Sequence, residues 1–302
     1  MSQGVIHASE KNIQNMQQFY HDYLIDAPQG SIFRAKKPTV TITAYNSGKV
    51  LFQGKDATME LTKWDSNKSS PPLAKKTGTV PEHIFSASHI GSDESGTGDY
   101  FGPVTAASCY VTEENIEKLR AIGIQDSKNL TDEKALELSK QIVALKIPYA
   151  LLTINNEKYN DLQQSGWSQG KMKAMIHHHV HRLLLEKIKE ALYSGIVIDQ
   201  FCEPSLYERY IQSENEQLFP KTYFTTKAES YSIAVAAASV IARAQFLKAM
   251  DKLSEKVGFR LLKGASAKVD EQIAKIITRD RSELYHCAKV HFANTKKAEQ
   301  YL

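Results

Sequence analysis

A stretch without hydrophobic periodicity interrupts the chain and limits what it can fold into. Residues 65–82 read DSNKSSPPLAKKTGTVPE and are rich in Ser, Pro, Lys and Gly. Such a stretch has no apolar face to bury, which is typical of a linker. The chain has 302 residues, enough for two domains at roughly 100–200 residues each. We therefore expect an N-terminal domain over residues 1–64, a linker over 65–84 and a larger domain over 85–302.

The composition is that of an ordinary globular protein, with 42% hydrophobic and 24% charged residues. The three cysteines, Cys109, Cys202 and Cys287, are far apart and form no CxxC pair. This indicates reduced thiols and a cytoplasmic location rather than disulfides or a zinc site. The start, MSQGVIHASEKNIQ, has no apolar core of a secretory signal, and the longest apolar stretch, SIAVAAASVIARA, is too short to span a bilayer. The net charge of +4 permits a polyanionic partner without demanding one.

The N-terminal region predicts a helix and a β-hairpin. Ser9 is expected to cap a helix that places apolar residues on one buried face, namely Ile13, Met16, Phe19, Tyr20 and Leu24. Residues 39–54, TVTITAYNSGKVLFQG, alternate in polarity around an Asn-Ser-Gly turn and predict two antiparallel strands with one solvated face.

Basic residues outnumber acidic ones around that hairpin. The bases are Arg34, Lys36, Lys37, Lys49, Lys55 and Lys63, opposed by Asp56 and Glu60. A basic sheet face with threonines and a tyrosine suits a nucleic-acid backbone. A merely solvated sheet face explains the same pattern equally well.

The region after the linker predicts a mixed α/β fold. Residues 88–95 and 104–111 read as an antiparallel hairpin joined by a glycine-rich loop, and 195–201, GIVIDQF, read as a buried parallel strand. A further strand is expected over 147–154. Helices are expected after a Thr131 cap, over about 171–193, over about 229–250, and near 268–279 and 281–291. Strands alternating with helices imply a mixed sheet covered by helices.

Four acidic residues fall at the ends of these elements. Asp93 and Glu94 close the first strand, Asp199 follows the parallel strand, and Glu229 begins the alanine-rich helix. Each alone has a structural explanation, such as a helix-start charge for Glu229 or a turn cap for Asp199. Carboxylates that converge repel one another unless a cation lies between them, and oxygen-preferring divalent ions are the natural counter-charge. Together the four predict a site for two such ions, which can drive in-line phosphodiester displacement.

Four stretches carry a resemblance to a known family. In order they are GSDESGTGDYFGPVTAA, DSKNLT, GIVIDQF and TTKAESYSIAVAAASVIAR. They resemble the type 2 ribonuclease H family, in its ribonuclease HIII branch, over most of residues 85–302. The resemblance implies a ribonuclease H-like fold that hydrolyses the RNA strand of RNA/DNA hybrids by two-metal-ion catalysis with Mg²⁺ or Mn²⁺. The products would carry 5′-phosphate and 3′-OH ends, and Asp93, Glu94, Asp199 and Glu229 match the four catalytic, metal-binding acids.

Three features favour the HIII branch over ribonuclease HII. The loop reads Gly96-Thr97-Gly98 where HII enzymes typically have GRG, and the fourth acid is Glu229 where they have Asp. Residues 1–64 also resemble the TATA-binding-protein-like domain that precedes the nuclease in ribonuclease HIII. That domain is expected to bind substrate through its basic face.

The resemblance also assigns substrate contacts. The backbone of Gly96, Thr97 and Gly98 is expected to approach ribose 2′-OH groups, because glycine has no Cβ to block that approach; turn glycines are the plain alternative. Ser127 and Lys128, in the turn DSK, are expected on substrate phosphates, although an ordinary turn would look the same. Lys227 is expected to touch a phosphate or to moderate the charge of the acids.

Two other features receive no role. His177 and His181, in HHHVH, are one helical turn apart and could pair on zinc, but no third ligand follows, so we expect surface or groove histidines. Lys289, Lys296 and Lys297 would follow a nucleic-acid backbone or only aid solubility. The partner is thus an RNA/DNA hybrid, bound by a monomer without any membrane association. The alternatives are HII-type incision at single embedded ribonucleotides and a catalytically inactive hybrid-binding protein.

Overall fold

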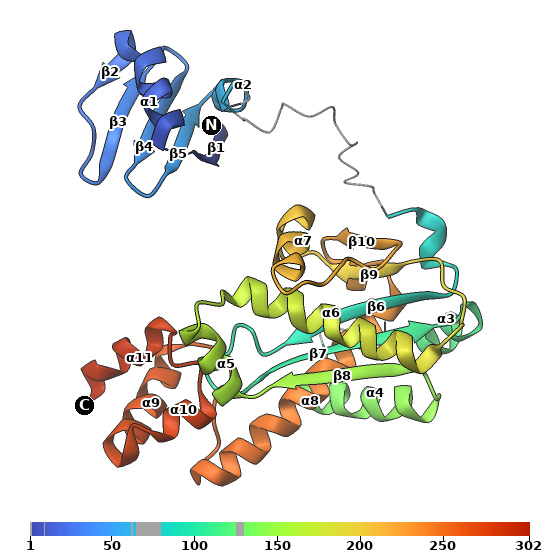
Figure 1. Cartoon of the computed structure of the whole chain (residues 1–302). Helices are drawn as coiled ribbons and strands as arrows, with labels where there is room; N and C mark the ends of the chain where they lie inside the picture. The colour runs from blue at the N-terminus through green and yellow to red at the C-terminus, as the bar shows by residue number, and fades with distance from the viewer. Residues whose placement is uncertain (1, 9, 62, 65–79, 125–129) are drawn as a thin grey trace. The chain divides into compact units, whose positions relative to one another are not determined.

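The computed structural model describes residues 2–8, 10–61, 63–64, 80–124 and 130–302 (Figure 1). It divides into two compact units, Met1–Lys75 and Lys76–Leu302, and each is treated by itself. Residues 65–79 of the predicted linker lie outside the described residues. The next segment, Glu82–Phe85, forms the 3₁₀ helix η2, and its Ile84 is buried against Val197 and Val235 of the second unit.

The first unit is one antiparallel sheet with a helix on it (Figure 1). The strand order is β1-β5-β4-β3-β2. The elements are β1 Ser2–His7, α1 Glu10–Phe19, η1 His21–Tyr23, β2 Leu24–Ile25, β3 Ser31–Lys36, β4 Val40–Tyr45, β5 Lys49–Gly54 and α2 Ala57–Leu61. The predicted hairpin is confirmed as β4 and β5, with Ile42 opposite Phe52.

The predicted N-terminal helix is confirmed, but its buried face is shorter than expected. Ile13, Met16 and Tyr20 are buried against the sheet, whereas Phe19 is 58% exposed. Leu24 was wrongly assigned to this face, because the chain turns through η1 after α1 and Leu24 starts β2, opposite Ala35 of β3. The proposed cap residue, Ser9, lies outside the described residues.

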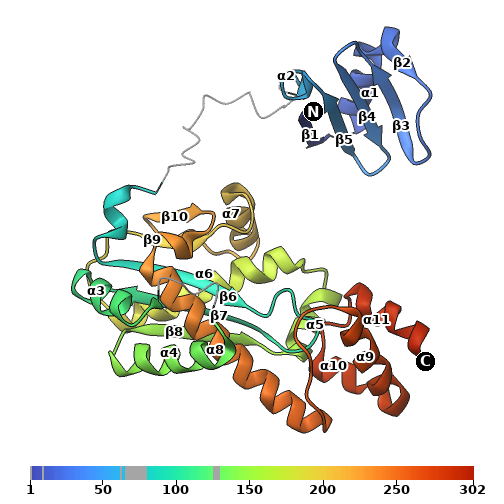
Figure 2. The same ribbon diagram turned by 180° about the vertical axis from the view of Figure 1, so that it is seen from behind.

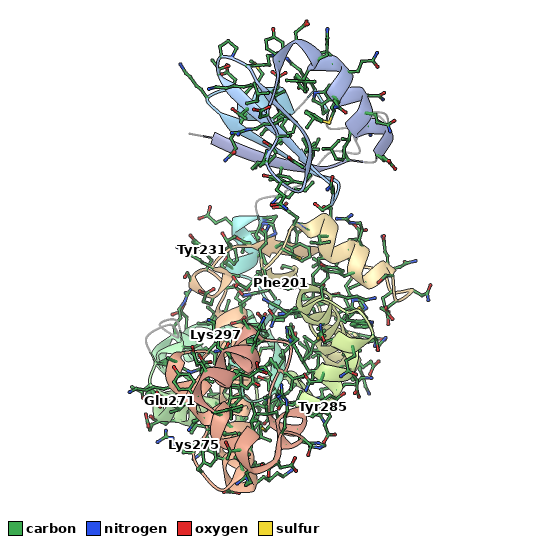
Figure 3. All side chains as sticks on the ribbon, turned by 90° about the vertical axis from the view of Figure 1, so that its left-hand side faces the viewer. Phe201, Tyr231, Glu271, Lys275, Tyr285 and Lys297 are labelled. Carbon is green, nitrogen blue, oxygen red and sulfur yellow. The ribbon has the colours of Figure 1, made fainter. Side chains whose placement is uncertain are left out.

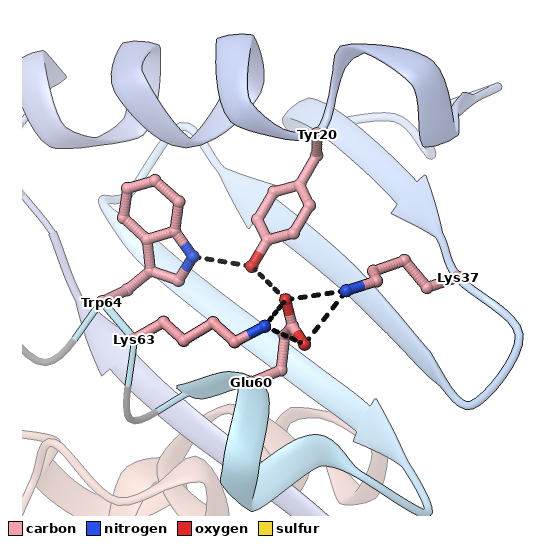
Figure 4. A network of polar contacts seen from close by, with 5 residues as sticks. All are labelled: Tyr20, Lys37, Glu60, Lys63 and Trp64. Carbon is pink, nitrogen blue, oxygen red and sulfur yellow. Dashed lines mark hydrogen bonds and ion pairs between the residues drawn. The ribbon is translucent and has the colours of Figure 1, made fainter.

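A buried carboxylate corrects the count of free bases in this unit. Glu60 is 2% exposed and accepts hydrogen bonds from Lys37 (3.1 Å), Lys63 (3.0 Å) and the Tyr20 hydroxyl (3.0 Å), which itself accepts one from the Trp64 indole (Figure 4). Burial alone would raise the pKa of Glu60, but these hydrogen bonds outweigh it and lower the pKa. Lys37 and Lys63 are therefore structural partners of Glu60, which balances part of their charge within the unit.

The open face of the sheet carries three of the four remaining bases, and the fourth, Lys55, lies in the turn after β5. Along β3, Phe33 and Ala35 are buried, so Arg34 and Lys36 project to the other face. Along β5, Val50 and Phe52 are buried and Lys49 is exposed on that same open side. This face thus keeps three of the six predicted bases.

The second unit is built on a mixed five-stranded sheet, as predicted. The strand order is β10-β9-β6-β7-β8, with β10, β9 and β6 parallel and β7 antiparallel to both β6 and β8. The strands are β6 His89–Ser95, β7 Val104–Val111, β8 Tyr149–Ile154, β9 Ile196–Asp199 and β10 Thr222–Thr225. The expected hairpin is β6 and β7, and the expected parallel strand is β9.

Helices cover both faces of this sheet (Figures 1 and 2). One face packs on α3 Glu113–Ala121, α4 Asp132–Ala144 and α8 Ile233–Val257, and the other on α6 Gln169–Ile188 and α7 Pro204–Gln212. The Thr131 cap of α4 is confirmed, since its hydroxyl accepts from the backbone N–H of Lys134. The remaining helices are α5 Asn156–Gln164, η4 Ala228–Ser230, α9 Ala267–Asp280, α10 Glu283–Cys287, α11 Ala293–Lys297 and η5 Ala298–Tyr301.

The helix α8 is a core helix in spite of its apolar length. Within the described residues it is the one helix long and apolar enough to cross a membrane, and 72% of its most apolar window is buried inside the protein. It lies directly on β6, where a Cβ on Gly91 would come within 2.3 Å of the Val235 nitrogen. Gly91 is therefore needed for this close approach of helix and strand.

Candidate active site

Two of the predicted acids lie at neighbouring strand ends. The parallel strands β6 and β9 pair through Ser92 and Ile198, and one residue further along each strand come Asp93 and Asp199. Neighbouring strands are about 4.8 Å apart, so the two carboxylates emerge side by side at the carboxyl edge. Asp93 also accepts a hydrogen bond from Ser239 of α8, which fixes its side chain on the α8 face.

The third acid, Glu229, is brought to this edge by a short turn. It was expected at the start of the long helix, but it lies in the preceding 3₁₀ turn η4, and α8 starts only at Ile233. The backbone N–H of Ala228 donates to Asp199 Oδ1 at 2.8 Å, which holds η4 against the end of β9. The turn is entered through Lys227, whose φ of 56° is left-handed. Lys227 is exposed beside the acids, as its predicted role requires.

Glu94 points to the other face of the sheet. Side chains alternate along a strand, so Asp93 faces α8 whereas Glu94 faces α6. Glu94 Oε1 forms an ion pair with Lys173 at 2.6 Å, and Oε2 accepts from His177 Nε2 at 2.7 Å. The acids therefore come from both faces of the sheet and meet only at its edge.

The electrostatics distinguish Glu94 from Asp93 and Asp199. Burial raises the pKa of Asp93 well above its usual range, and the charges of Glu94 and Asp199 add to this effect. Burial likewise raises the pKa of Asp199, with Glu229 and Glu94 as further causes. Burial would also raise the pKa of Glu94, but the hydrogen bonds and charges of His177 and Lys173 outweigh it and lower that pKa to about 2. At Asp93 and Asp199, in contrast to Glu94, burial and the neighbouring acids outweigh the groups that lower the pKa.

The histidines of α6 form a buried chain behind Glu94. Ser92 Oγ lies 2.7 Å from Nδ1 of His177 and 2.9 Å from Nε2 of His181. The other ring nitrogen of His181, Nδ1, lies 3.0 Å from Ser108 Oγ. In either protonation state of His177, its Nε2–H donates to the carboxylate of Glu94, while Ser92 links the other ring nitrogen of His177 to His181 and, beyond it, Ser108. The chain therefore orients Glu94 from the core.

The sequence-based interpretation of these histidines was wrong. His177 and His181 are 0% and 1% exposed, and neither is a surface or groove residue. Lys173 was not considered at all, although Lys173, His177 and His181 are four residues apart and so share one helix face. A polar stripe with this spacing on an otherwise buried helix was the signal that could have revealed them. Phe201, which is labelled in Figure 3, contacts both partners of Glu94. Its ring stacks on His177, and the Lys173 ammonium lies 4.1 Å from its ring centroid.

The acidic edge fits a divalent cation by its donor chemistry. Carboxylate oxygens are the donors that Mg²⁺ and Mn²⁺ prefer. A bound cation would supply the positive charge that offsets both the burial of Asp93 and Asp199 and the repulsion from the neighbouring acids. Over the part of the chain that the structure describes, no group of three or more His, Cys, Asp or Glu side chains is already gathered around one metal position. Both oxygens of Glu94 already contact α6, one through Lys173 and the other through His177. On metal binding, one of these oxygens would contact both the metal and its partner on α6.

The glycine loop, residues 96–103, joins β6 to β7 beside this edge. Gly96 is required by the fold itself, because its φ is +91° and an added Cβ would meet the Pro103 carbonyl at 2.2 Å. Gly98 is different, since it is exposed, has no left-handed φ, and an added Cβ would have no atom within 4 Å. The Thr97 carbonyl accepts from Gln169 of α6 at 2.8 Å. The fold therefore does not itself require a glycine at position 98.

The other predicted phosphate contacts are not located. Ser127 and Lys128 lie outside the described residues, between Ile124 and Leu130. Of the six predicted substrate-binding residues, the structure therefore describes Gly96, Thr97, Gly98 and Lys227.

A mixed sheet whose carboxyl edge gathers Asp93, Asp199 and Glu229, with Glu94 at the same edge, defines a metal-dependent nuclease of the type 2 ribonuclease H class. Family comparison agrees with this class. The family model described as Ribonuclease HII matches residues 90–295, and a model described as a domain of unknown function (DUF3378) matches residues 3–77.

Full-length relatives specify the branch. The chain is 52% identical to a ribonuclease HIII of Oceanobacillus iheyensis, with all of both chains covered, and 44% identical to one of Bacillus subtilis, with 99% of this chain and 98% of the relative covered. The crystal structure of Bst-RNase HIII in complex with Mn²⁺ is similar with a TM-score of 0.71 at 42% identity, over 99% of this chain and 98% of that one. The chain belongs to the ribonuclease HIII family. It is a metal-dependent endoribonuclease that cleaves RNA in RNA/DNA hybrids.

Proposed function

We propose that Asp93, Glu94, Asp199 and Glu229 are the catalytic acids and that they hold two Mg²⁺ or Mn²⁺ ions when the hybrid is bound. The observation that carries this proposal is the adjacency of Asp93 and Asp199 at the ends of two parallel strands, each with a raised pKa. Their mutual repulsion is an energetic cost that a bound cation relieves. Two ions bound there would activate a water and stabilise the leaving oxygen, giving 5′-phosphate and 3′-OH ends.

Each of the four acids has its own proposed role in holding the metal ions. Asp93 and Asp199 hold the metals from the α8 face, where Ser239 and the Ala228 N–H fix their orientations. Glu94 binds from the α6 face, oriented by His177. Glu229, next to Ala228 in η4, holds or orients the second ion and the attacking water. The turn that carries Glu229 is thus attached to the strand that carries Asp199.

Recognition of RNA is assigned to the glycine loop. The exposed backbone at Gly98 has room for a ribose, and backbone groups beside the acids read the 2′-OH without reading sequence. Ser127, Lys128 and Lys227 would contact phosphates on either side of the cleaved bond.

The N-terminal unit, residues 1–64, is proposed as a TATA-binding-protein-like substrate-binding domain. After the correction for Glu60, its open sheet face keeps Arg34, Lys36 and Lys49. Replacing Lys36 by Ala is expected to raise KM for a hybrid by about 2- to 5-fold with kcat unchanged, because it removes one phosphate contact. Lys37→Ala is the matched control, since Lys37 is engaged by Glu60. Equal KM values for Lys36→Ala and the wild type would contradict the assignment.

The active form is proposed to be a cytoplasmic monomer. Because its relatives belong to the HIII branch, long hybrids are expected to be cut far better than a duplex carrying one ribonucleotide. Direct comparison of these two substrates separates the HIII activity from HII-type incision.

The decisive test replaces Asp199 by Asn. The amide oxygen can still accept from the Ala228 N–H, so the fold is retained while a negative charge is lost. Hybrid binding is expected to persist and Mn²⁺-dependent cleavage to fall on the order of 10²-fold or more, as it would on adding a chelator to the wild type. Undiminished cleavage by Asp199→Asn would overturn the proposed role of the acids. A wild-type protein that binds the hybrid but never cuts it would instead indicate an inactive hybrid-binding protein.

A further inference from the structure

Lys289 is a lysine with no contact to solvent. Its side chain is 0% exposed, although the sequence placed it among residues that would follow a nucleic acid or aid solubility. Nor does it form an ion pair within the described part of the chain. Lysine is almost never fully buried without a paired acid, because burying its charge is costly. A position like this one calls for an explanation in terms of what the ammonium contacts.

The ammonium contacts the glycine loop. Its Nζ donates to the Asp99 carbonyl at 2.7 Å and to the Gly102 carbonyl at 2.6 Å. The Gly102 carbonyl also accepts from Asn156 of α5 at 2.8 Å. One side chain therefore ties together two points of the loop that are three residues apart, and burial strengthens such charge-assisted hydrogen bonds.

The backbone around Lys289 is also hydrogen-bonded to the glycine loop. Its own N–H donates to the Tyr100 carbonyl at 2.8 Å, and Gly102 N–H donates to the Cys287 carbonyl at 2.9 Å, on either side of a bridge between Phe101 and Ala288. The segment 287–289 is thus paired with the second half of the glycine loop. The first half, with Thr97 and Gly98, is tied to other segments through Gln169, which donates to the Thr97 carbonyl, and through the Asp99 side chain, which accepts from Gly264 N–H at 2.6 Å.

We propose that Lys289 is a positioning residue for RNA recognition, whose ammonium fixes the glycine loop so that its Thr97–Gly98 backbone meets the ribose. Lys289 touches neither metal nor substrate in this role and acts only through the loop. The inference rests on the proposed function of the glycine loop. It adds a residue from the far C-terminal part of the chain to the recognition of the sugar.

The test replaces Lys289 by Met, which keeps an unbranched apolar stem and removes the donors. The matched control is Lys187→Met, because Lys187 also donates its ammonium to a backbone carbonyl, that of Tyr149 (2.8 Å), but on the surface. Lys187 is also near the opposite end of α6 from Gln169, about 27 Å along the helix. If Lys289→Met does not fold, Asn156→Ala takes its place as the test variant. It removes another hydrogen bond to the Gly102 carbonyl and leaves no buried charge behind.

Two readouts are measured at a temperature where all variants are folded. Hydrogen–deuterium exchange of the amides in 96–103 is expected to rise about 10-fold or more in Lys289→Met, and less in Asn156→Ala. The binding preference for an RNA/DNA hybrid over the same-sequence DNA duplex, by fluorescence anisotropy without divalent metal, is expected to fall about 5-fold or more. Lys187→Met is expected to match the wild type in both.

The results distinguish the positioning role of Lys289 from the proposed function of the glycine loop. Unchanged loop exchange in Lys289→Met, or raised exchange with an undiminished hybrid preference, overturns the positioning role and leaves Lys289 a packing residue. A wild type that shows no preference for the hybrid contradicts instead the proposed function of the loop, and does so without reference to Lys289.

Discussion

His177 Nε2 lies 2.7 Å from Glu94 Oε2, and this contact ties an acid at the end of β6 to the buried interior of α6. The same carboxylate receives Lys173 on its other oxygen. These two partners lower the pKa of Glu94, whereas burial raises the pKa values of Asp93 and Asp199.

Replacing His177 by Asn should impair catalysis through the orientation of Glu94. Groups that orient metal ligands typically contribute 10- to 100-fold to metal affinity or activity, so hybrid cleavage at fixed Mn²⁺ is expected to fall by about that factor. Raising the Mn²⁺ concentration should restore part of it. His179→Asn is the control, since His179 lies on the same helix and contacts Arg182 instead; equal activity of the two variants would argue against an orienting role.

The two glycines of the loop should respond differently to alanine. Gly96→Ala is expected to destabilise the protein by about 1–3 kcal/mol or more, because the left-handed φ and the Pro103 carbonyl leave no room for a Cβ. Gly98→Ala should leave the melting temperature unchanged and raise KM for the hybrid, because its Cβ meets nothing until substrate arrives. Thermal unfolding and steady-state kinetics on both variants check this. A Gly98→Ala enzyme with wild-type KM would leave the loop without contact to the ribose.

Stability should rise with pH through Lys289. Burial lowers the pKa of Lys289 from its ordinary value of 10.5 to about 7, with Asp99 opposing the shift. Between these values the unfolded chain holds a proton at this position that the folded chain has released, so folding becomes more favourable as pH rises, by at most about 1.4 kcal/mol per pH unit.

The measurement is the melting temperature of the wild type and Lys289→Met from pH 7 to pH 9.5. The advantage of the wild type should widen over this range, whereas the difference between the wild type and Lys187→Met should stay constant. A constant difference for Lys289→Met would mean that this lysine does not change its protonation there.

Local patterns predicted much of the fold because they depend on neighbours in sequence. The alternation of residues 39–54 and the apolar run at 196–198 were sufficient to predict β4, β5 and β9. The strand β1 was missed, since it is defined by pairing with β5 far along the chain, Val5 opposite Leu51. The boundary of α8 was placed too early for a similar reason, because Ala228 bonds to Asp199 and holds η4 apart from the helix.

The same distinction between local pattern and distant contacts holds for the residues of the site. Oxygen-bearing side chains at element ends could be found from the sequence, because strand ends of such sheets meet at one edge. The groups behind them could not, since their roles depend on tertiary burial. Polar residues such as His177, Glu60 and Lys289 are usually exposed, and here each is enclosed by partners from distant segments. Spacing alone does not reveal such partners.

Metal binding by the acids can be seen by anomalous diffraction from crystals of the chain with Mn²⁺ and an RNA/DNA hybrid. The Asp199→Asn variant prevents turnover, and the wild type without hybrid serves for comparison. Mn²⁺ peaks are expected at the carboxyl edge of β6 and β9, about 2.1 Å from carboxylate oxygens of Asp93 and its neighbours. Manganese bound elsewhere, with no peak within reach of Asp93, would contradict metal binding by the acids.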